Sequence, residues 1–539
     1  MAEYAATPTG AATALLDVLS PKGRWVQHAG SWLMLGMLQS MGLYDIAQRH
    51  RGRAVQGFSL RVALDAVAVA LSLGETCAEG VRRLQTPTLG TLLRHRRGIT
   101  ADWARQVLGE FANGASGEFH RGVAERLLHD AMHDDHRVFL YIDNHLRPYS
   151  GKHEIRKGWH MQDKRAVRGT TDYYVHDEQG CPLWRMTTAS HDSLCAWLRP
   201  AVEFVEEALG KQAVPVLMFD RGGAFPEAMA ELRNLGAEFI TYERAPYPML
   251  APTEFTEELR VMVPSKPRKP IIIRYTDTRG KNLGSGRGRV RRVALKMPDG
   301  QQINLLAAST LPAETLIRRQ LARWGYQENQ FKHEVERWGL NHLDSRTVEP
   351  YPPDAIIPNP ARRQLERQLK LAEATEGRAL RLLAHLGPDD PKRARLEQER
   401  GAAVARQEQL LQLRPKVPAR ARVDETPLAD KLQRHRPQMK TVLDTIRIAL
   451  ANAEADLALR LRPGMDRPRE AKKLLANVLA APGRVALASN ASAVRVRLEP
   501  AANPAERAAI ACLLRNVNRL RLSLPGDRDY RPLRFGMLK

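Results

Sequence analysis

The sequence predicts an α/β fold in which a core is interrupted by a β-rich insertion and flanked by helical regions. Three observations lead to this prediction. Strand-like runs alternate with amphipathic helices between residues 136 and 245. Further β-type runs follow up to residue 312, and helical periodicity then returns. At 539 residues, and at ~100–200 residues per domain, the chain can hold three or four units.

Residues 1–135 carry mostly helical periodicity, as in DAVAVALSLG and DWARQVLGEFANG. We expect a helical N-terminal domain here. The region has no residue spacing that is typical of a catalytic site.

The first part of the core spans residues 136–245. RVFLYID reads as a buried strand, and two β-rich runs around the turn DEQG read as a hairpin. An amphipathic helix ends at Gly210, and the apolar run AVPVLMF then ends in Asp220. The expected order is strand, strand, strand, helix, strand, helix and strand, at residues 137–143, 169–190 (the hairpin), 191–210, 213–220, 226–236 and 237–245.

Residues 246–312 interrupt this pattern with Pro-rich and Gly-rich connections and three β-type runs, PIIIRYTDT, RVRRVALKM and QQINLLAAS. An inserted β module is the simplest interpretation. The core is expected to resume at 313–345 with one long helix.

Residues 346–455 are predicted to hold a Pro-rich linker and a helical hairpin. Apolar residues recur there at spacings of three, four and seven, at Leu365, Leu369, Ala372, Ala379, Leu383 and Leu386. GPDDP breaks the first helix, and a second charged helix reaches Leu413. Residues 456–539 alternate helical and strand-like runs, including LRLSLPG, and predict a small α/β C-terminal domain.

The charge balance indicates a polyanionic partner. The chain has 83 Lys and Arg against 60 Asp and Glu, a formal net charge of +23. Nucleic acid is favoured over a membrane because no segment has the ~20 apolar residues of a spanning helix. The four cysteines form no CxxC pair, and the N-terminal residues lack the features of a signal peptide. We therefore expect a cytoplasmic protein, although a basic surface can also be merely solvated.

Two carboxylates follow strand-like runs directly. Asp143 ends the first strand and Asp220 the fourth. Carboxylate oxygens suit hard cations such as Mg²⁺, and two ions ~3.5–4 Å apart can stabilise both oxygens of a phosphodiester displacement. Taken alone, either aspartate would more often be a loop acid or a helix cap, and Asp220 could simply shape a turn.

A third acid is expected on the helix at 313–345. Its apolar stripe steps by three and four residues through Trp324 and Phe331, and Glu328 lies inside the stripe. At ~100° per residue, Glu334 and Glu336 fall at or beyond its edges. A carboxylate on a core-facing stripe costs stability unless it is paired or bound to metal, which favours Glu328 as the third ligand over an ordinary buried ion pair.

The motifs YIDNH, LMFDRGG and RWGYQENQFKHE, with this order of elements, resemble the DDE transposases of bacterial insertion sequences. The resemblance covers residues 137–343 well and the flanks loosely. It implies an RNase H-like core in which Asp143, Asp220 and Glu328 bind two Mg²⁺ ions, with Mn²⁺ as a substitute. It also implies cleavage of transposon ends, strand transfer into target DNA, terminal inverted repeats and target DNA as partners, a homodimer in the active complex, a bacterial nucleoid location and DNA-end binding by a flanking domain.

The same resemblance indicates candidate DNA contacts near the acids and in the basic segment after the first strand. They are Lys332, Arg221, Arg147, Lys152, Arg156, Lys157, Lys164, Arg165 and Arg323. For the basic segment, a clamp on a DNA end and a flexible solvated loop are equally weighted.

Two other functions stay open at this point. One is a metal-dependent nuclease of the same fold without strand transfer. The other is a domesticated DNA-binding protein without activity, although the presence of all three acids argues against it.

Overall fold

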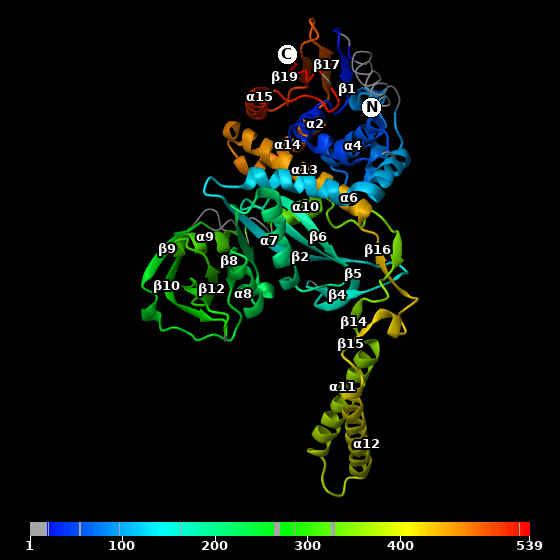
Figure 1. Cartoon of the computed structure of the whole chain (residues 1–539), viewed down its shortest axis with the longest axis vertical. Coiled ribbons are helices and arrows are strands. Elements are labelled where there is room, and N and C mark those ends of the chain that lie inside the picture. Colours follow the sequence, from blue (N-terminus) through cyan, green and yellow to red (C-terminus); the bar gives the residue numbers. More distant parts are fainter. Residues whose placement is uncertain are drawn as a thin grey trace.

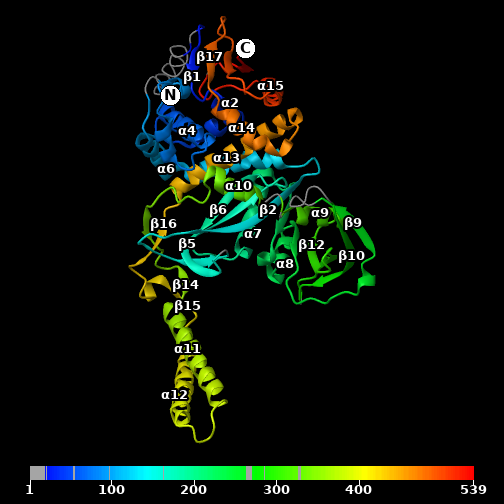
Figure 2. The ribbon, with the colours of Figure 1, turned by 180° about the vertical axis from the view of Figure 1, so that it is seen from behind.

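The computed structural model describes residues 19, 21–52, 55–95, 98–161, 163–262, 270–284, 286–323, 325, 329–527 and 529–538, without the side chain of residue 279. A layer of helices lies over a central sheet, a β-rich lobe extends from one edge of the sheet, and a helical arm projects away from the body (Figure 1). Figure 2 shows the same arrangement from behind. The predicted α/β fold is confirmed in this coarse form.

Five strands form the centre of the sheet, in the order β6-β5-β2-β7-β8. β2, β7 and β8 are parallel, whereas β5 is antiparallel to both of its neighbours. The strands are β2 (Arg137–Pro148), β5 (Arg165–His176), β6 (Pro182–Thr188), β7 (Val214–Phe219) and β8 (Glu238–Tyr242). β2 is longer than predicted because β5 continues to pair with it as far as Pro148.

Each face of this sheet is covered by helices. Leu140 and Ile142 of β2 face the core shared with α7 (Cys195–Leu209) and α8 (Pro226–Asn234). Phe139 and Tyr141 alternate with them and face the core shared with α9 (Ala313–Arg323).

The predicted insertion does not form a sheet of its own. Its strands continue the central sheet, because β12 pairs with β8 in antiparallel register from Leu305 opposite Tyr242. The added strands are β9 (Glu257–Val261), β10 (Ile271–Asn282), β11 (Arg289–Lys296) and β12 (Gln302–Ala308).

Beyond the insertion, α9 spans Ala313–Arg323 and α10 spans Asn329–Trp338. Gly325, the described residue between them, is π-helical. Because a π-helical turn shifts the register of the residues that follow it, the periodicity of a regular α-helix cannot be extended from α9 into α10.

The N-terminal and C-terminal regions share one hydrophobic core instead of forming separate layers. The N-terminal helices are α2 (Ser31–Ser40), α3 (Leu43–His50), α4 (Gly57–Ser72), α5 (Leu89–Leu93) and α6 (Ala101–Ala131). α2, α4 and α6 pack on α13 (Gln438–Leu461), and α2 and α4 also pack on α14 (Ala471–Ala480). The boundary predicted at residue 455 falls inside α13.

A second, four-stranded sheet joins the two ends of the chain, which lie at the same end of the molecule (Figure 1). β1 (Arg24–Val26) pairs with β17 (Gly483–Leu487), which leads to β18 (Val494–Leu498) and β19 (Leu533–Met537). α15 (Pro504–Arg519) packs on β19. The strand-like run LRLSLPG forms turns and loop instead of a strand.

The arm is the predicted helical hairpin. α11 (Pro360–Leu383) packs on α12 (Lys392–Leu413), with Leu365, Ala372 and Ala379 buried between them as the spacing predicts. Short strands close its base: β14 (Ile356–Pro358) with β15 (Arg420–Arg422), and β13 (Val348–Pro350) with β16 (Leu432–His435). β16 also pairs with β3 (Glu154–Ile155), which fixes the base to the segment after β2.

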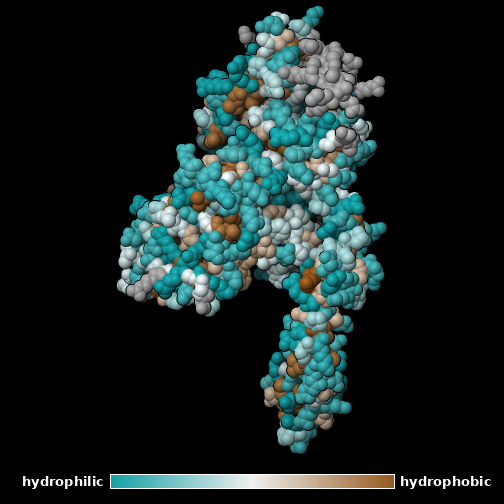
Figure 3. Space-filling model, viewed as in Figure 1, coloured by the Kyte–Doolittle hydropathy of each residue, from teal (hydrophilic) through white to brown (hydrophobic). Residues whose placement is uncertain are grey.

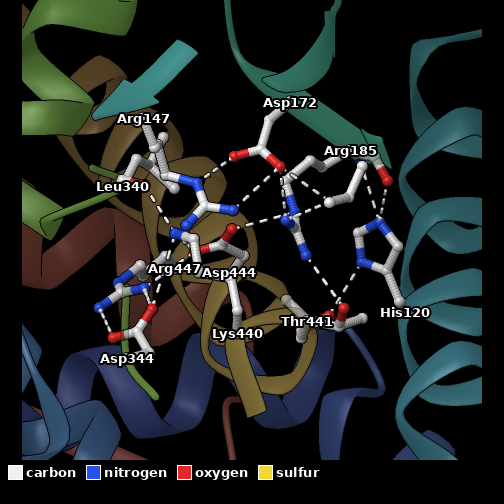
Figure 4. Close-up of polar contacts among 12 residues, drawn as sticks. His120, Arg147, Asp172, Arg185, Leu340, Asp344, Lys440, Thr441, Asp444 and Arg447 are labelled. Atoms are coloured by element: carbon white, nitrogen blue, oxygen red, sulfur yellow. Dashed lines mark hydrogen bonds and ion pairs between the residues drawn. The ribbon is translucent and has the colours of Figure 1, made fainter. Parts of the chain in front are cut away.

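A buried ion network connects the central sheet to the helical layer (Figure 4). It consists of Arg147, Asp172, Arg185, Asp344, Lys440, Asp444 and Arg447. Asp172 of β5 accepts hydrogen bonds from Arg147 and, at 2.9 Å, from Arg185 of β6.

Asp444 of α13 continues the network. It lies 3.0 Å from Arg185, 2.7 Å from Lys440 and 2.8 Å from Arg447. Arg447 binds Asp344, in the loop after α10, at 2.5 Å.

The proximity of opposite charges sets the protonation of this network. Burial alone would raise the pKa of Asp172, but Arg147 and Arg185 hold it well below its usual range. Burial lowers the pKa of Lys440 to about 8. Burial also lowers the pKa of the adjacent His120 to about 4, so that this imidazole is neutral at pH 7.

We expect Asp172→Asn to destabilise the protein by roughly 3–5 kcal/mol, because it leaves the buried guanidinium group of Arg147 without its counter-charge and removes one of the two carboxylates that bind Arg185. The measurement is the urea midpoint of the transition that unfolds the central sheet. Asp102→Asn is the matched control, since Asp102 pairs with Arg82 at 2.9 Å on the surface, where such a pair contributes little. Equal shifts in the two variants would contradict the role of the network.

Candidate active site

Asp143 and Asp220 occupy corresponding positions on the two central parallel strands. Ile142 of β2 is in register with Phe219 of β7, and this is the last pair of their parallel ladder. The two aspartates are the next residue on each chain, so they lie side by side where the parallel pairing ends. In open α/β sheets this carboxyl end is where ligands bind.

The two aspartates also share one face of the sheet. Phe139 and Tyr141 of β2, and Val216 and Met218 of β7, belong to the core that includes α9. Asp143 and Asp220 continue the same alternation, which directs them towards the α9 face.

Arg323, the last residue of α9, binds Asp143. Its Nη2 donates to Oδ2 of Asp143 at 3.0 Å, and the backbone N–H of Asn144 donates to Oδ1 at 2.9 Å. Arg323 is buried, whereas the Asp143 side chain is 36% exposed.

The surroundings of Asp143 favour its protonated form. Burial raises the pKa of Asp143, the Arg323 guanidinium opposes this rise, and the nearby Asp220 carboxylate adds to it. A further cation beside the two carboxylates would favour the ionised form of Asp143.

Asp220 also has a local structural role. Its Oδ1 accepts a hydrogen bond from the N–H of Gly222 at 2.8 Å and so caps the short 3-10 turn η2 (Arg221–Gly223). Thr241 of β8 donates to the Asp220 carbonyl oxygen at 3.0 Å. The turn-shaping role weighed above is therefore present, and it fixes the backbone that carries the carboxylate.

α9 is bound directly to the strands that carry the aspartates. Tyr141 donates its hydroxyl to the carbonyl oxygen of Arg319 at 3.0 Å, and Gln320 donates to the carbonyl oxygen of Phe219 at 3.3 Å. The C-terminal end of α9 is thereby held over the ends of β2 and β7.

α10 is held on its other side by the helical layer. His333 lies 2.7 Å from Glu454 of α13, and Arg337 donates to the carbonyl oxygen of Ser72 at 2.6 Å. The chain between Arg323 and Asn329 thus connects two fixed helices.

The predicted third acid, Glu328, lies outside the described residues, as does Trp324 of its stripe. The placement of Glu334 at the edge of the stripe is wrong. Glu334 is fully buried, and its Oε2 lies 3.5 Å from Nε2 of His176. The error arises because the chain between α9 and α10 is π-helical at Gly325, which shifts the register of the residues that follow. Glu336 is exposed, as predicted.

The two aspartates fit a divalent cation in their chemistry. Both offer carboxylate oxygen, the donor that Mg²⁺ prefers, and they are adjacent. Among the described residues, no group of three His, Cys, Asp or Glu side chains could hold a metal. The segment that contains Glu328 follows α9 in the sequence and lies outside the described residues.

The candidate DNA contacts divide into two groups. The exposed side chains are Arg221, Lys152, Lys157, Lys164, Arg165 and Lys332, and Arg156 is half-buried and donates to the Tyr351 hydroxyl at 2.9 Å. The prediction that Arg147 and Arg323 contact DNA is corrected by the structure. Both side chains are buried; Arg147 binds Asp172, and Arg323 binds Asp143. Arg147 balances a fully buried carboxylate, and Arg323 balances the partly exposed carboxylate of Asp143.

Arg244 is a cation at this edge of the sheet that the sequence analysis missed. It follows β8, is exposed and stacks over the ring of Phe225 at 4.1 Å. The sequence could have indicated this residue, because Arg244 lies at the end of a strand-like run, as the two aspartates do.

Three comparisons with known proteins and one search for membrane spans complete the description. A family model described as "Transposase protein" matches residues 25–531. No curated protein matches the chain. A cryo-EM structure of the piggyBac transposase synaptic complex with hairpin DNA is similar at 9% sequence identity and a TM-score of 0.38, over 82% of this chain and 79% of that chain. No helix in the described part of the chain is long and apolar enough to cross a membrane.

Proposed function

The chain belongs to the transposase family whose model it matches, and from this premise we propose that it is a metal-dependent DDE transposase of a bacterial insertion sequence. In this proposal it cleaves the ends of its transposon and joins them to target DNA. The observation that carries the proposal is the pair Asp143 and Asp220, adjacent at the end of the central parallel ladder and facing α9.

We assign Asp143, Asp220 and Glu328 as the ligands of two Mg²⁺ ions, with Mn²⁺ as a substitute. Bound there, the ions would supply an activated water or 3′-hydroxyl and stabilise the charge that develops on the phosphate. The sheet order and the position of the aspartates on its central strands support the assignment of the core as RNase H-like.

The protein's own residues set the charge at this site. Arg323 orients Asp143 and offsets its charge from one side, so that the carboxylate is held in place before DNA binds. Arg221 is next to Asp220 in the sequence, and Lys332 lies on α10. Both side chains are exposed, and we propose that they contact phosphates. The formal net charge of +23 supplies attraction to DNA that does not depend on base sequence.

We further propose a homodimer in which the arm joins two protomers or contacts the second DNA end. In the described part of the chain, α11 and α12 pack mainly on each other, and the arm projects from the body (Figure 1). Leu371 and Leu382, eleven residues apart on one face of α11, are exposed. On the face shown in Figure 3, hydrophobic residues are visible along the arm as well as at places on the body.

The first prediction from this function concerns the two aspartates. Asp143→Asn and Asp220→Asn should each abolish Mg²⁺-dependent cleavage of DNA that carries the inverted repeats flanking the gene, because each removes a charged ligand. DNA binding should stay within a few-fold. Cleavage is read on denaturing gels, and joined products in the same reaction distinguish a transposase from a nuclease.

Asp135→Asn is the control for this prediction, since Asp135 precedes the opposite end of β2 and pairs with Arg137 on the surface. It should cleave normally. Normal cleavage by either site variant would refute the metal assignment.

The second prediction identifies the third acid. Glu328→Gln should lose cleavage while it retains DNA binding, because it keeps the shape of the side chain and removes its charge. Glu336→Gln, at an exposed position of α10, should cleave normally. Glu334→Gln, inside the protein beside His176, should also retain cleavage. Activity in Glu328→Gln with loss in Glu334→Gln would assign the ligand to α10.

The third prediction concerns the arm. Replacing residues 362–413 with a short flexible linker should impair pairing of two DNA ends more than binding of one end. A short linker can replace the arm because the two chain segments at its base are already close together. β14 pairs with β15, and the backbone N–H of Asn359 donates to the carbonyl oxygen of Ala419 at 3.0 Å. Gel-shift assays that separate single-end from paired-end complexes measure both. Equal loss of the two complexes, with normal unfolding of the body, would argue against a role in pairing.

A further inference from the structure

A two-stranded ribbon extends the sheet beyond the candidate active site. β4 (Lys157–His160) pairs with the first residues of β5, with Lys157 opposite Arg168 and Trp159 opposite Ala166. The other end of β5 pairs with Asp143 through Tyr174. Ala166 and Tyr174 are thus on one strand, roughly 26 Å apart at about 3.3 Å per residue.

One face of the ribbon is fixed to the body. Gly158 is buried, and a Cβ atom at this position would come within 2.5 Å of His191. His191 is itself held by Thr171, at 2.7 Å, and by the carbonyl oxygen of Arg156, at 3.2 Å. Because neighbouring residues of a strand point to opposite faces, Trp159 is directed away from the body.

The outward face carries a large uncovered aromatic surface. Trp159 is 60% exposed, and Met161, two residues further, is 75% exposed. The residue opposite Trp159 is Ala166, whose methyl group is too small to cover an indole ring. The indole is therefore held in an exposed position by a sheet whose other face is packed.

The charges around Trp159 are mostly positive. Lys157, Lys164 and Arg165 are exposed on the same ribbon. Of the nearby acids, Asp163 pairs with His160 and Arg165 at 3.3 Å, and Glu154 pairs with Arg168. Aromatic side chains among cations are the arrangement by which proteins stack on nucleobases and hold the adjoining phosphates.

We propose that Trp159 stacks on an unpaired nucleobase of the DNA that occupies the candidate active site, while Lys157 and Lys164 contact the adjoining phosphates. The proposal rests on the proposed function, because it takes the same DNA as its ligand. The occupant is an unpaired base because a base inside a duplex has both of its faces covered. We take the DNA to run along β5, in which case, at about 3.4 Å per nucleotide, the stacked base would lie roughly eight nucleotides from the scissile phosphate.

The experiment measures binding without chemistry, in the Asp143→Asn background. Fluorescence anisotropy compares a fully paired duplex of the transposon end with the same duplex carrying one mismatch about eight base pairs from the cleavage position. The protein should prefer the mismatched duplex, and Trp159→Ala should reduce that preference by about tenfold. Trp159→Phe should keep most of it. Lys157→Gln should weaken binding to both duplexes equally.

Trp25→Ala is the matched control, since Trp25 is 51% exposed on β1 in the distant four-stranded sheet. It should leave the preference unchanged. Equal effects of Trp25→Ala and Trp159→Ala, or equal weakening of both duplexes by Trp159→Ala, would overturn the proposal. A change in oligomeric state on light scattering, with unchanged preference, would reassign the face to a protein partner.

The outcome is separable from that of the proposed function. A wild-type protein that discriminates the two duplexes through Trp159 but never cleaves DNA supports the stacking site and refutes the transposase chemistry. A protein that cleaves DNA but whose preference for the mismatched duplex does not depend on Trp159 supports the transposase chemistry and refutes the stacking site. Absence of DNA binding by the wild-type protein overturns both.

Discussion

The position of the central sheet depends on the buried ion network between β5 and α13. Four basic side chains and three carboxylates meet there, and two of the carboxylates, Asp172 and Asp444, are each shared by cations from different elements. Such a cluster is a costly way to fill a protein interior, because every charge has lost its hydration. The network also specifies one position of the sheet relative to α13, because a shifted or rotated sheet would leave a buried charge unpaired. The apolar layers on either side tolerate more rearrangement than this network does.

The same network explains how the site is built from distant parts of the chain. The aspartates come from β2 and β7, and α9 binds both strands through backbone carbonyl groups. Asp344, in the loop after α10, is fixed to α13 by Arg447. α9 is thereby fixed to the sheet and α10 to the helical layer. The arrangement of the two aspartates thus depends on residues that lie far from them in the sequence.

Local patterns in the sequence were sufficient to predict that the two aspartates lie at the ends of neighbouring strands, but not to predict which residues surround them. Each aspartate follows an apolar run, and strand direction alone brings them together at one edge. Arg147 and Arg323 were misassigned because their partners, Asp172 and Asp143, lie 25 and 180 residues away. Periodicity also cannot reveal the π-helical conformation at Gly325, which shifts the register and is why Glu334 was placed on the wrong side. The shared sheet of β12 and β8 and the pairing of β1 with β17 are long-range features that composition and spacing do not encode.

The pairing of β1 with β17 has a consequence for how the protein matures. β1 begins at Arg24, and its partner begins at Gly483, so β1 must wait until the chain as far as β17 has been made before it can pair. Domains usually fold in order during synthesis. Here the central sheet can form early, whereas the helical layer that receives its ion network through Asp444 is completed last. A chain released early by a premature stop codon would therefore carry both aspartates and yet lack the support that holds them in register.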